Sequence, residues 1–401
     1  MRENAVFCRG LGLAVAALLC ALGSHAQTVA QYTAGENNLS YLVIEAETGF
    51  VLAEHNADEV RPPASMLKMM MMLLVAEGIE DGSWSLNDEI VTSRKAAEMW
   101  GSQVYLREGE VWTLGDLMVA VSVRSANDGA MAVAEGLWGS EEAYLERMNE
   151  RALELGMVDT KFHSVNGLPP SDNNTPFDQT TARDMAILAQ WCVTHPQIME
   201  WVGMRQMNVA PRSQDRRNNT NRLLTQMPDA DGLKTGYIRA AGYCVTATAE
   251  RNGVRLIAVV MGFQNSNNRF HLAEHLLTEG FDSMRRVLLF AQGEPMEDSI
   301  EVRNSEAQRV HLQPLDDVWV SVHVDSVYDL EVITTTPAHL RAPLGAGAEV
   351  GRVRVQMNGS VLAETPLIVA EAVEEAGWRW KLKHSLLRNL QTQPATTTAQ
   401  R

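Results

Sequence analysis

Hydrophobic residues that favour β-strands gather in two pairs of short runs within the first 285 residues. Residues 41–46 and 50–52 form one pair of such runs, and residues 242–249 and 254–263 form another. The second pair is separated by a turn containing Asn252-Gly253. Asn-Gly between two apolar runs is a strong signal for a tight turn. The pattern therefore predicts two antiparallel hairpins.

Between and after these hairpins, hydrophobic residues recur at the three- and four-residue spacing of helices. The predicted helices cover residues 114–123, 129–137, 141–155, 180–193 and 270–289. Residues 164–179 are rich in Asn, Pro and Ser, which is typical of a loop. Strand-like and helix-like segments thus alternate through a first domain, which we place at residues 30–290.

The pattern changes after about residue 292. Residues 300–369 contain short valine-rich runs between Gly and Pro turns, and 318–324 and 349–355 alternate most cleanly. Regularly spaced short strands with little helical signal are typical of an all-β fold. We expect a small all-β domain over residues 295–372.

The amino terminus has the pattern of a signal peptide. Arg2 and Arg9 precede the apolar residues 11–22, and Ser24-His25-Ala26 provides a small-residue cleavage site. We therefore expect residues 1–26 to be removed before Gln27 and the chain to be exported.

The carboxyl terminus, residues 373–401, forms a basic tail. Residues 378–390 carry four Lys or Arg and no acidic residue, together with Trp and Leu. Such a stretch suits an anionic membrane surface. A carboxyl-terminal strand or an unstructured tail is the alternative.

The chain as a whole is acidic, with 34 Lys and Arg against 50 Asp and Glu and a formal net charge of −16. This balance disfavours binding to nucleic acid. Only Cys192 and Cys244 lie outside the predicted signal peptide. One disulfide and a free buried pair are the two alternatives for these thiols.

Ser65 and Lys68 are the first candidates for chemistry. They lie at the start of a helix predicted after Pro62-Pro63, whose residues 66–75 are otherwise apolar on every face. Residues three apart share one helix face, and burial lowers the pKa of a lysine. A neutral amine could then accept the proton of the serine hydroxyl. The alternative is a helix-start serine beside a lysine that extends from a core helix.

A second candidate motif, Asp231-Gly232-Leu233-Lys234-Thr235-Gly236, directly precedes the second hairpin. Gly236 leaves room for a ligand at a sheet edge, and an edge strand can pair with an extended peptide. Lys234 and Thr235 offer a charge and a hydroxyl to an anionic substrate end. A surface lysine that begins a strand is the alternative.

The pattern Ser-x-Asn occurs five times. The pairs are Ser85/Asn87, Ser125/Asn127, Ser164/Asn166, Ser171/Asn173 and Ser266/Asn268. Ser125 and Asn127 lie between two predicted helices, where a rigid scaffold can hold a catalytic group. Ser171 and Asn173 lie in the polar loop, so we select the Ser125 pair.

Other chemistries lack their motifs. The sequence has no His/Cys cluster with zinc spacing, no Gly-rich phosphate loop after a strand and no G-x-S-x-G. His163 and His271 are interpreted as ordinary polar residues. We expect neither a metal nor a cofactor.

Together, Ser65-x-x-Lys68, Ser125-x-Asn127 and Lys234-Thr235-Gly236 resemble the motifs of the serine penicillin-recognising enzymes. Flanking residues narrow the resemblance to the D-alanyl-D-alanine carboxypeptidases, which are low-molecular-mass penicillin-binding proteins. These flanking segments are Arg124 to Asp128, Leu155 to Met157, Thr160 to Phe162, Thr181 to Met185 and Asp231 to Gly236. The resemblance implies a β-lactamase/transpeptidase-like domain, with an antiparallel sheet and a helical lobe, followed by a small β-sandwich.

The resemblance also implies a reaction. Ser65 would attack the carbonyl of the penultimate D-alanine in a peptidoglycan stem peptide that ends in D-Ala-D-Ala. Lys68 would be its general base, and Ser125 would relay a proton to the leaving D-alanine, with Lys234 nearby. β-Lactam antibiotics would be covalent inhibitors.

Binding roles follow in the same way. Asn127 would hold a substrate amide, and the backbone N–H groups of Ser65 and Tyr237 would form the oxyanion hole. Thr235, beside Gly236, would bind the terminal carboxylate, and Arg269 would orient it. A histidine is frequent in the family at the position of Tyr237, so side-chain effects on pH dependence can differ here.

Three alternatives stay open at this stage. A β-lactamase shares the acylation residues but needs rapid deacylation, commonly through a glutamate that we do not identify. A peptidoglycan endopeptidase is a second enzymatic alternative. A non-catalytic peptidoglycan-binding module would predict the loss of Ser65, Lys68 or Lys234. The carboxypeptidase resemblance further implies a periplasmic location, with peripheral contact to the inner membrane through the tail.

Overall fold

The computed structural model describes residues 2–7, 29, 32–33, 35–36, 38–207, 217–297, 299–325, 329–357, 359–380 and 382. Contacts within the chain divide it into two compact units, with the division between Met284 and Arg285. In these ranges no helix is both long enough and apolar enough to span a bilayer.

The first unit is built on a five-stranded antiparallel sheet in the order β3-β2-β10-β9-β8. The strands are β2 Ser40–Glu45, β3 Val51–His55, β8 Ala230–Ile238, β9 Gly242–Arg251 and β10 Val254–Phe263. Both predicted hairpins are confirmed. Asn252 and Gly253 have φ angles of 53° and 76°, which a two-residue hairpin turn requires and Asn-Gly tolerates.

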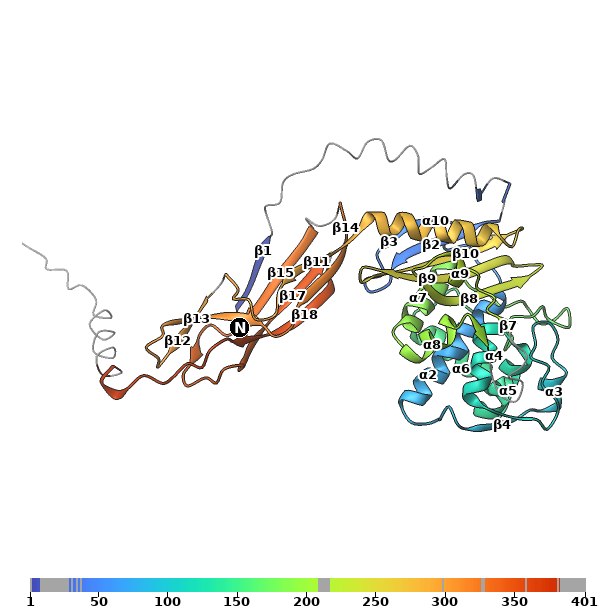
Figure 1. Ribbon diagram of the computed structural model, residues 1–401, viewed down its shortest axis with the longest axis horizontal. Coiled ribbons are helices and arrows are strands. Elements are labelled where there is room, and N and C mark those ends of the chain that lie inside the picture. Colours follow the sequence, from blue (N-terminus) through green and yellow to red (C-terminus); the bar gives the residue numbers. More distant parts are fainter. Residues whose placement is uncertain are drawn as a thin grey trace, which may run out of the picture. The chain divides into compact units, whose positions relative to one another are not determined.

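Helices cover both faces of this sheet (Figure 1). One face packs against α10 Asn268–Ser283, and the other against α7 Ala182–Val193, α8 Pro196–Gly203 and the helical lobe beyond them. The lobe contains α4 Leu114–Arg124, α5 Asn127–Trp138 and α6 Glu141–Glu154. These helices confirm the predicted mixed α/β architecture. Short elements complete the unit: α3 Arg94–Ala97, α9 Leu223–Gln226, β4 Glu89–Val91, β5 Val111–Thr113, β6 Gln206–Met207 and β7 Arg217–Asn218.

Helix α2, Lys68–Glu80, runs through the core of this unit. Residues Lys68 to Ala76 are all buried, as the apolar pattern on every face predicted. A short 3₁₀ turn, η2 Ala64–Leu67, precedes α2 and carries Ser65. The sequence therefore places the Ser65–Lys68 pair at the buried start of a core helix.

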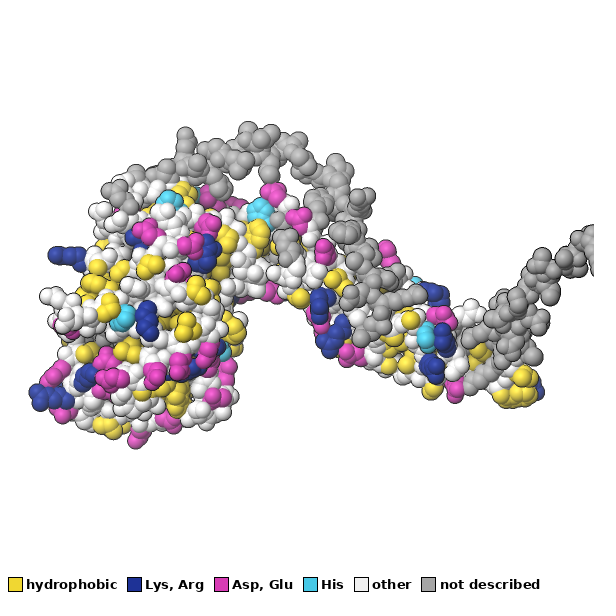
Figure 2. Space-filling model, turned by 180° about the vertical axis from the view of Figure 1, so that it is seen from behind, with side chains coloured by type: hydrophobic (Ala, Val, Ile, Leu, Met, Phe, Trp, Pro, Cys, Tyr) yellow, Lys and Arg dark blue, Asp and Glu magenta, His cyan; other side chains and the backbone are white. Residues whose placement is uncertain are grey.

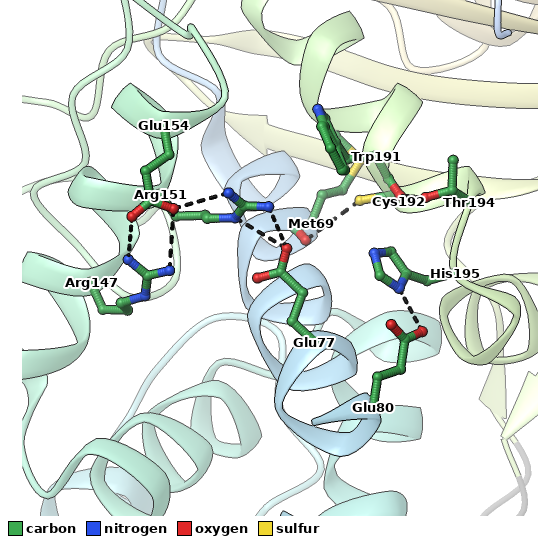
Figure 3. Close-up of polar contacts among 10 residues, drawn as sticks. All are labelled: Met69, Glu77, Glu80, Arg147, Arg151, Glu154, Trp191, Cys192, Thr194 and His195. Carbon is green, nitrogen blue, oxygen red and sulfur yellow. Dashed lines mark hydrogen bonds and ion pairs between the residues drawn. The ribbon is translucent and has the colours of Figure 1, made fainter. Parts of the chain in front are cut away.

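Charged residues at the carboxyl-terminal end of α2 form ion pairs with neighbouring segments of the chain (Figure 3). The guanidinium of Arg151 on α6 donates to Glu77 at 2.6 Å and to Glu154 at 2.9 Å. On the other side of α2, Nδ1 of His195 lies 2.7 Å from Glu80. Arg151 and Glu77 are both largely buried, so this ion pair contributes to holding α6 against α2.

Replacing Arg151 with alanine is expected to lower the free energy of unfolding by about 1–2 kcal/mol, because it leaves the partly buried Glu77 without its cation. Urea denaturation of the purified protein measures this change. Arg94→Ala is the matched control, since the Arg94–Glu98 pair is exposed on both sides and its loss should leave stability almost unchanged. Equal effects of the two variants would contradict the prediction.

The predicted helix over residues 270–289 is wrong in its last part. Helix α10 ends at Ser283, and residues Met284–Phe290 form strand β11, which pairs with β14 Val318–His323. The helical spacing of apolar residues continues past Ser283, but Val287 and Phe290 also suit a strand. Pairing with β14 provides the backbone hydrogen bonds, and this long-range partner cannot be read from local spacing.

The second unit is β-rich, as predicted. Its main sheet has seven strands in the order β1-β15-β17-β18-β13-β12-β16. The strands are β1 Arg2–Phe7, β12 Ser299–Arg303, β13 Arg309–Pro314, β15 Leu330–Thr336, β16 Leu340–Arg341, β17 Glu349–Met357 and β18 Ser360–Val369. In β17, Val353 and Val355 are buried while Arg352 and Arg354 are exposed, which confirms the alternation seen in the sequence.

Both terminal predictions fall largely outside the described residues. Of the predicted signal peptide, only Arg2–Phe7 is described, as β1, and it pairs antiparallel with β15. Of the basic tail, Val373 pairs with Leu344 in an isolated antiparallel bridge, residues 378–380 and 382 are helical, and residues 381 and 383–401 lie outside the described ranges. Signal-peptide cleavage and membrane contact stay predictions.

Candidate active site

Ser65 lies on a turn that two distant glycines approach closely. A Cβ atom on Gly236 would lie 2.7 Å from the carbonyl oxygen of Pro63, and one on Gly167 would overlap the backbone of Ala64. Ala64 itself has a left-handed φ of 47°, which is uncommon for a residue with a side chain. Strand β8 and the loop at Gly167 therefore enclose the Ser65 turn from two sides.

The Lys68 ammonium is the centre of the site. It is fully buried, and its Nζ lies 3.0 Å from Ser65 Oγ, 2.9 Å from Asn127 Oδ1 and 2.8 Å from the carbonyl oxygen of Asn166. The Ser65 hydroxyl also donates to the Asn166 carbonyl at 3.3 Å. The structure thus brings Ser65, Lys68 and Asn127 into direct contact, and the reach of Lys68 to Ser65 is the one that their three-residue spacing predicted.

Burial holds the pKa of Lys68 well below its usual value, and the nearby charge of Lys234 lowers it further. Asp178 and Asp128 act in the opposite direction. Burial likewise lowers the pKa of Lys234 to about 7, with help from Arg269 and Arg124. The neutral form of Lys68 is therefore accessible, as a general base requires.

Ser125 and Asn127 lie at the corner between α4 and α5. Ser125 has a left-handed backbone with φ of 59°, and among the described residues its buried hydroxyl has no hydrogen-bond partner. Asn127 is fixed at both ends of its amide, because its Nδ2 donates to the carbonyl of Trp100 at 2.6 Å. The corner therefore presents one unpaired hydroxyl and one immobilised amide.

Lys234, Thr235 and Gly236 lie on β8, the strand at one edge of the sheet and next to the Ser65 turn. The Thr235 hydroxyl donates to the hydroxyl of Thr220 at 2.8 Å. The side chain of Tyr237 is half exposed and stacks on Tyr243, with 4.1 Å between ring centroids. A substrate chain can therefore lie along this edge beside the nucleophile.

Gly236→Ala is expected to lower the rate of penicillin acylation about 100-fold, because the new methyl group displaces the Ser65 turn. Stopped-flow labelling with a fluorescent penicillin measures the rate. Gly345→Ala is the control, since nothing lies within 4 Å of that position. An unchanged rate in Gly236→Ala would show that the turn tolerates the contact.

Arg269 lies behind β8 with most of its guanidinium buried. Its Nη1 donates to the carbonyl oxygens of Gly236 at 3.0 Å and Cys244 at 2.9 Å, and the group lies over the rings of Tyr243 and Phe270. Through these two hydrogen bonds, Arg269 holds the end of the Lys-Thr-Gly strand in place.

Sequence comparison adds independent information. The D-alanyl-D-alanine carboxypeptidase family matches residues 26–265, and the C-terminal domain of penicillin-binding protein 5 matches residues 285–375. The chain belongs to the D-alanyl-D-alanine carboxypeptidase family. This confirms the resemblance drawn from the motifs.

Relatives of this carboxypeptidase cover most of its length. The chain is 31% identical over 351 residues to D-alanyl-D-alanine carboxypeptidase DacF of Bacillus subtilis, covering 86% of this chain and 88% of the relative. It is 32% identical over 347 residues to DacC of Escherichia coli, covering 84% and 85%.

Solved structures agree with the fold. Penicillin-binding protein 5 from Haemophilus influenzae has a TM-score of 0.63 at 26% identity and covers 84% of this chain and 97% of that one. Penicillin-binding protein D2 from Listeria monocytogenes, in its ampicillin-bound form, has a TM-score of 0.55 at 31% identity and covers 60% of this chain and 96% of that one. These neighbours confirm the predicted fold class of a carboxypeptidase with a β-rich carboxyl-terminal domain.

The structure adds residues that the motifs did not identify. The carbonyl of Asn166 accepts from both Lys68 and Ser65, and the buried carboxylate of Asp178 holds the same loop by accepting from the backbone N–H groups of His163 and Ser164. Composition predicted this loop, and Ser164/Asn166 was one of the five Ser-x-Asn patterns, but neither signal indicated that its backbone contacts Lys68. Asp178 thus positions the loop that holds the carboxypeptidase's lysine.

The rejected pattern Ser171/Asn173 lies in an exposed loop. There Asp172 accepts hydrogen bonds from the backbone N–H groups of Asn174 and Thr175, which stabilise the loop itself. Asn127 contacts Lys68 directly and Ser125 lies two residues before it, whereas the rejected pair lies on the exposed loop.

Asp178→Asn is expected to move the acidic limb of the pH–rate profile for acylation toward lower pH. The Asp178 carboxylate raises the pKa of Lys68, so its neutralisation lets the amine lose its proton at lower pH. Acylation rates measured from pH 5 to 10 test this. Asp172→Asn, in the same loop but exposed, is the control and should leave the profile in place.

Proposed function

We propose that Ser65 is the nucleophile of this serine-type D-alanyl-D-alanine carboxypeptidase. It attacks the carbonyl of the penultimate D-alanine of a peptidoglycan stem peptide and forms an acyl-enzyme. The observation that carries the proposal is the 3.0 Å contact between Lys68 Nζ and Ser65 Oγ at a fully buried site. That contact lies within the reach required of a nucleophile and its base.

Lys68 removes the hydroxyl proton as Ser65 Oγ bonds to the carbonyl carbon. The Ser125 hydroxyl, which makes no hydrogen bond within the described part of the chain, passes a proton to the leaving amine of D-alanine, with Lys234 nearby. Water then attacks the ester, releases the shortened peptide and restores the Ser65 hydroxyl.

The other predicted residues bind the substrate. Asn127 holds a peptide amide, and the backbone N–H groups of Ser65 and Tyr237 bind the oxyanion. The close approach of Gly236 to the Ser65 turn supports this pairing, since it brings β8 next to the nucleophile. Thr235 binds the terminal carboxylate, and Arg269 orients this end of the site through β8.

Purified protein with diacetyl-L-Lys-D-Ala-D-Ala tests the proposal, with D-alanine release followed beside nitrocefin hydrolysis. Steady release of D-alanine with slow nitrocefin turnover is the expected result. Fast nitrocefin hydrolysis with little D-alanine would instead assign a β-lactamase. Neither activity, without a penicillin adduct by mass spectrometry, would assign a binding module.

We also propose that the enzyme is exported to the periplasm after cleavage behind Ala26, and that residues 373–401 contact the inner membrane. The support is the sequence pattern at each end. Cosedimentation with anionic phospholipid vesicles tests the tail, and a chain ending at residue 377 is the control. Equal cosedimentation of both chains would remove the tail from the proposal.

A further inference from the structure

The loop formed by residues 99–106 borders the site at the start of α5. The side chain of Asn127, which contacts Lys68, also donates from Nδ2 to the carbonyl of Trp100 at 2.6 Å. The backbone N–H of Asn127 donates to the carbonyl of Ser102 at 2.7 Å. The backbone of Trp100 is therefore one hydrogen bond away from a side chain that contacts the buried lysine.

Asp128 holds the second half of the same loop. Its buried carboxylate accepts hydrogen bonds from the backbone N–H groups of Val104 at 3.1 Å and Leu106 at 3.0 Å. Tyr105, between these two donors, has a left-handed φ of 61°, which a residue with a side chain keeps only where its surroundings hold it. The backbone of the loop is therefore fixed, and its exposed side chains start from fixed positions beside the site.

Two large side chains of this loop are exposed, Trp100 to 58% and Tyr105 to 59%. The guanidinium of Arg217 lies over the Tyr105 ring, 5.2 Å from its centroid. Within the described ranges, no protein cation lies over the Trp100 indole. Leu168 is an apolar neighbour of the loop, since a Cβ on Gly101 would lie 3.4 Å from its Cδ2. Trp100 thus adds an exposed aromatic ring to an apolar rim of the site.

The part of the substrate that reaches this loop follows from the reaction proposed above. A peptide that ends in D-Ala-D-Ala has two amides near the nucleophile. The oxyanion hole and Ser125 act on the scissile amide, so Asn127 holds the other one, which joins the penultimate D-alanine to the residue before it. That preceding residue therefore lies beside Trp100. In the test peptide above it is L-Lys, whose side chain ends in an amine.

We propose that Trp100 binds the side chain of the residue that precedes D-Ala-D-Ala, and that it favours a free amine on that side chain over an acylated one. The proposal rests on the carboxypeptidase function above and names a recognition site for its substrate. A cation is attracted to the electron-rich face of a tryptophan ring, and an acylated amine has lost its charge. The enzyme would thus select stem peptides whose side-chain amine is not cross-linked.

The charge of the chain favours the same substrate. Its formal net charge is −16, and acidic side chains are spread over the face drawn in Figure 2. Such a field attracts a cationic peptide from a distance, but it acts on every variant of the loop alike. Loss of the preference on replacement of Trp100 therefore distinguishes binding by the indole from attraction by the whole molecule.

Two peptides that differ by one acetyl group test the proposal: Nα-acetyl-L-Lys-D-Ala-D-Ala, whose side-chain amine is free, and its diacetyl counterpart. We expect the kcat/KM of the wild type to be about two- to fivefold higher for the free amine, the usual size of a cation–π contact at an exposed site. Trp100→Leu keeps an apolar side chain and should remove this preference, and Trp100→Phe should keep part of it. Trp378→Leu, which replaces an exposed tryptophan of the second unit, is the control.

The outcomes separate this proposal from the proposed function. Equal kcat/KM for the two peptides in the wild type, or a preference that Trp100→Leu leaves unchanged, overturns the role of Trp100 alone. Failure to release D-alanine from either peptide overturns the carboxypeptidase function and the role of Trp100 with it. Urea denaturation of Trp100→Leu should match the wild type, because the side chain is mostly exposed, so a lost preference would not reflect unfolding.

Discussion

Ser65→Ala is expected to abolish covalent labelling by penicillin and to lower the rate of D-alanine release about a millionfold, as loss of a serine nucleophile does in other hydrolases. The Ser65 hydroxyl makes only one hydrogen bond as a donor, to the Asn166 carbonyl, so its removal should leave the fold intact. Intact-protein mass spectrometry after incubation with penicillin measures the adduct.

The matched control is Ser171→Ala, in the Ser-x-Asn pattern that lies in the exposed loop. It should be labelled at the wild-type rate. Substantial D-alanine release by Ser65→Ala, or loss of labelling in Ser171→Ala, would refute the assignment of the nucleophile.

Lys68→Gln is expected to slow acylation about 10²- to 10⁴-fold, which is the usual contribution of a general base. Glutamine can still donate to Asn127 or Asn166, but it cannot accept the Ser65 proton. The variant should also lose the rise of the acylation rate with pH that deprotonation of Lys68 gives the wild type. Stopped-flow acylation across pH measures both effects, and a rise that persists unchanged would assign the base elsewhere.

The same substitution changes how stability depends on pH. Burial holds the pKa of folded Lys68 well below the value of 10.5 that applies to an unfolded lysine. Between these two values the unfolded chain binds more protons, so the free energy of unfolding rises with pH. Lys68→Gln removes this contribution, and its stability should rise less steeply over that window in urea denaturation.

Much of this fold can be predicted from the sequence because its signals are local. The Asn252-Gly253 turn determines its own hairpin, and the helical spacing of apolar residues identifies α4, α6 and α7 without long-range information. Strand β11 could not be predicted in this way. Its partner β14 lies some 30 residues away, and the helical spacing of apolar residues continues into β11 itself.

The residues of the site also fall into two groups, those that local sequence identifies and those that only the fold reveals. Ser65, Lys68, Asn127 and Lys234 are identified by side-chain chemistry at fixed spacing, which a sequence displays directly. Asn166 acts through its backbone carbonyl, and every residue has one, so its role depends on where the loop packs. Asp178 and Thr220 act through partners distant in sequence, and only the folded structure shows them.

The two cysteines described above, Cys192 on α7 and Cys244 on β9, are free and fully buried. Burial raises the pKa of Cys192 and raises that of Cys244 to about 11, so neither thiol reacts readily in the folded enzyme. If residues 1–26 are removed as proposed, these are the only two cysteines left in the chain. The two thiols are therefore native reporters of local unfolding: the rate at which a thiol reagent labels Cys192 would measure exposure of the buried face of α7, and labelling of Cys244 would measure exposure of β9.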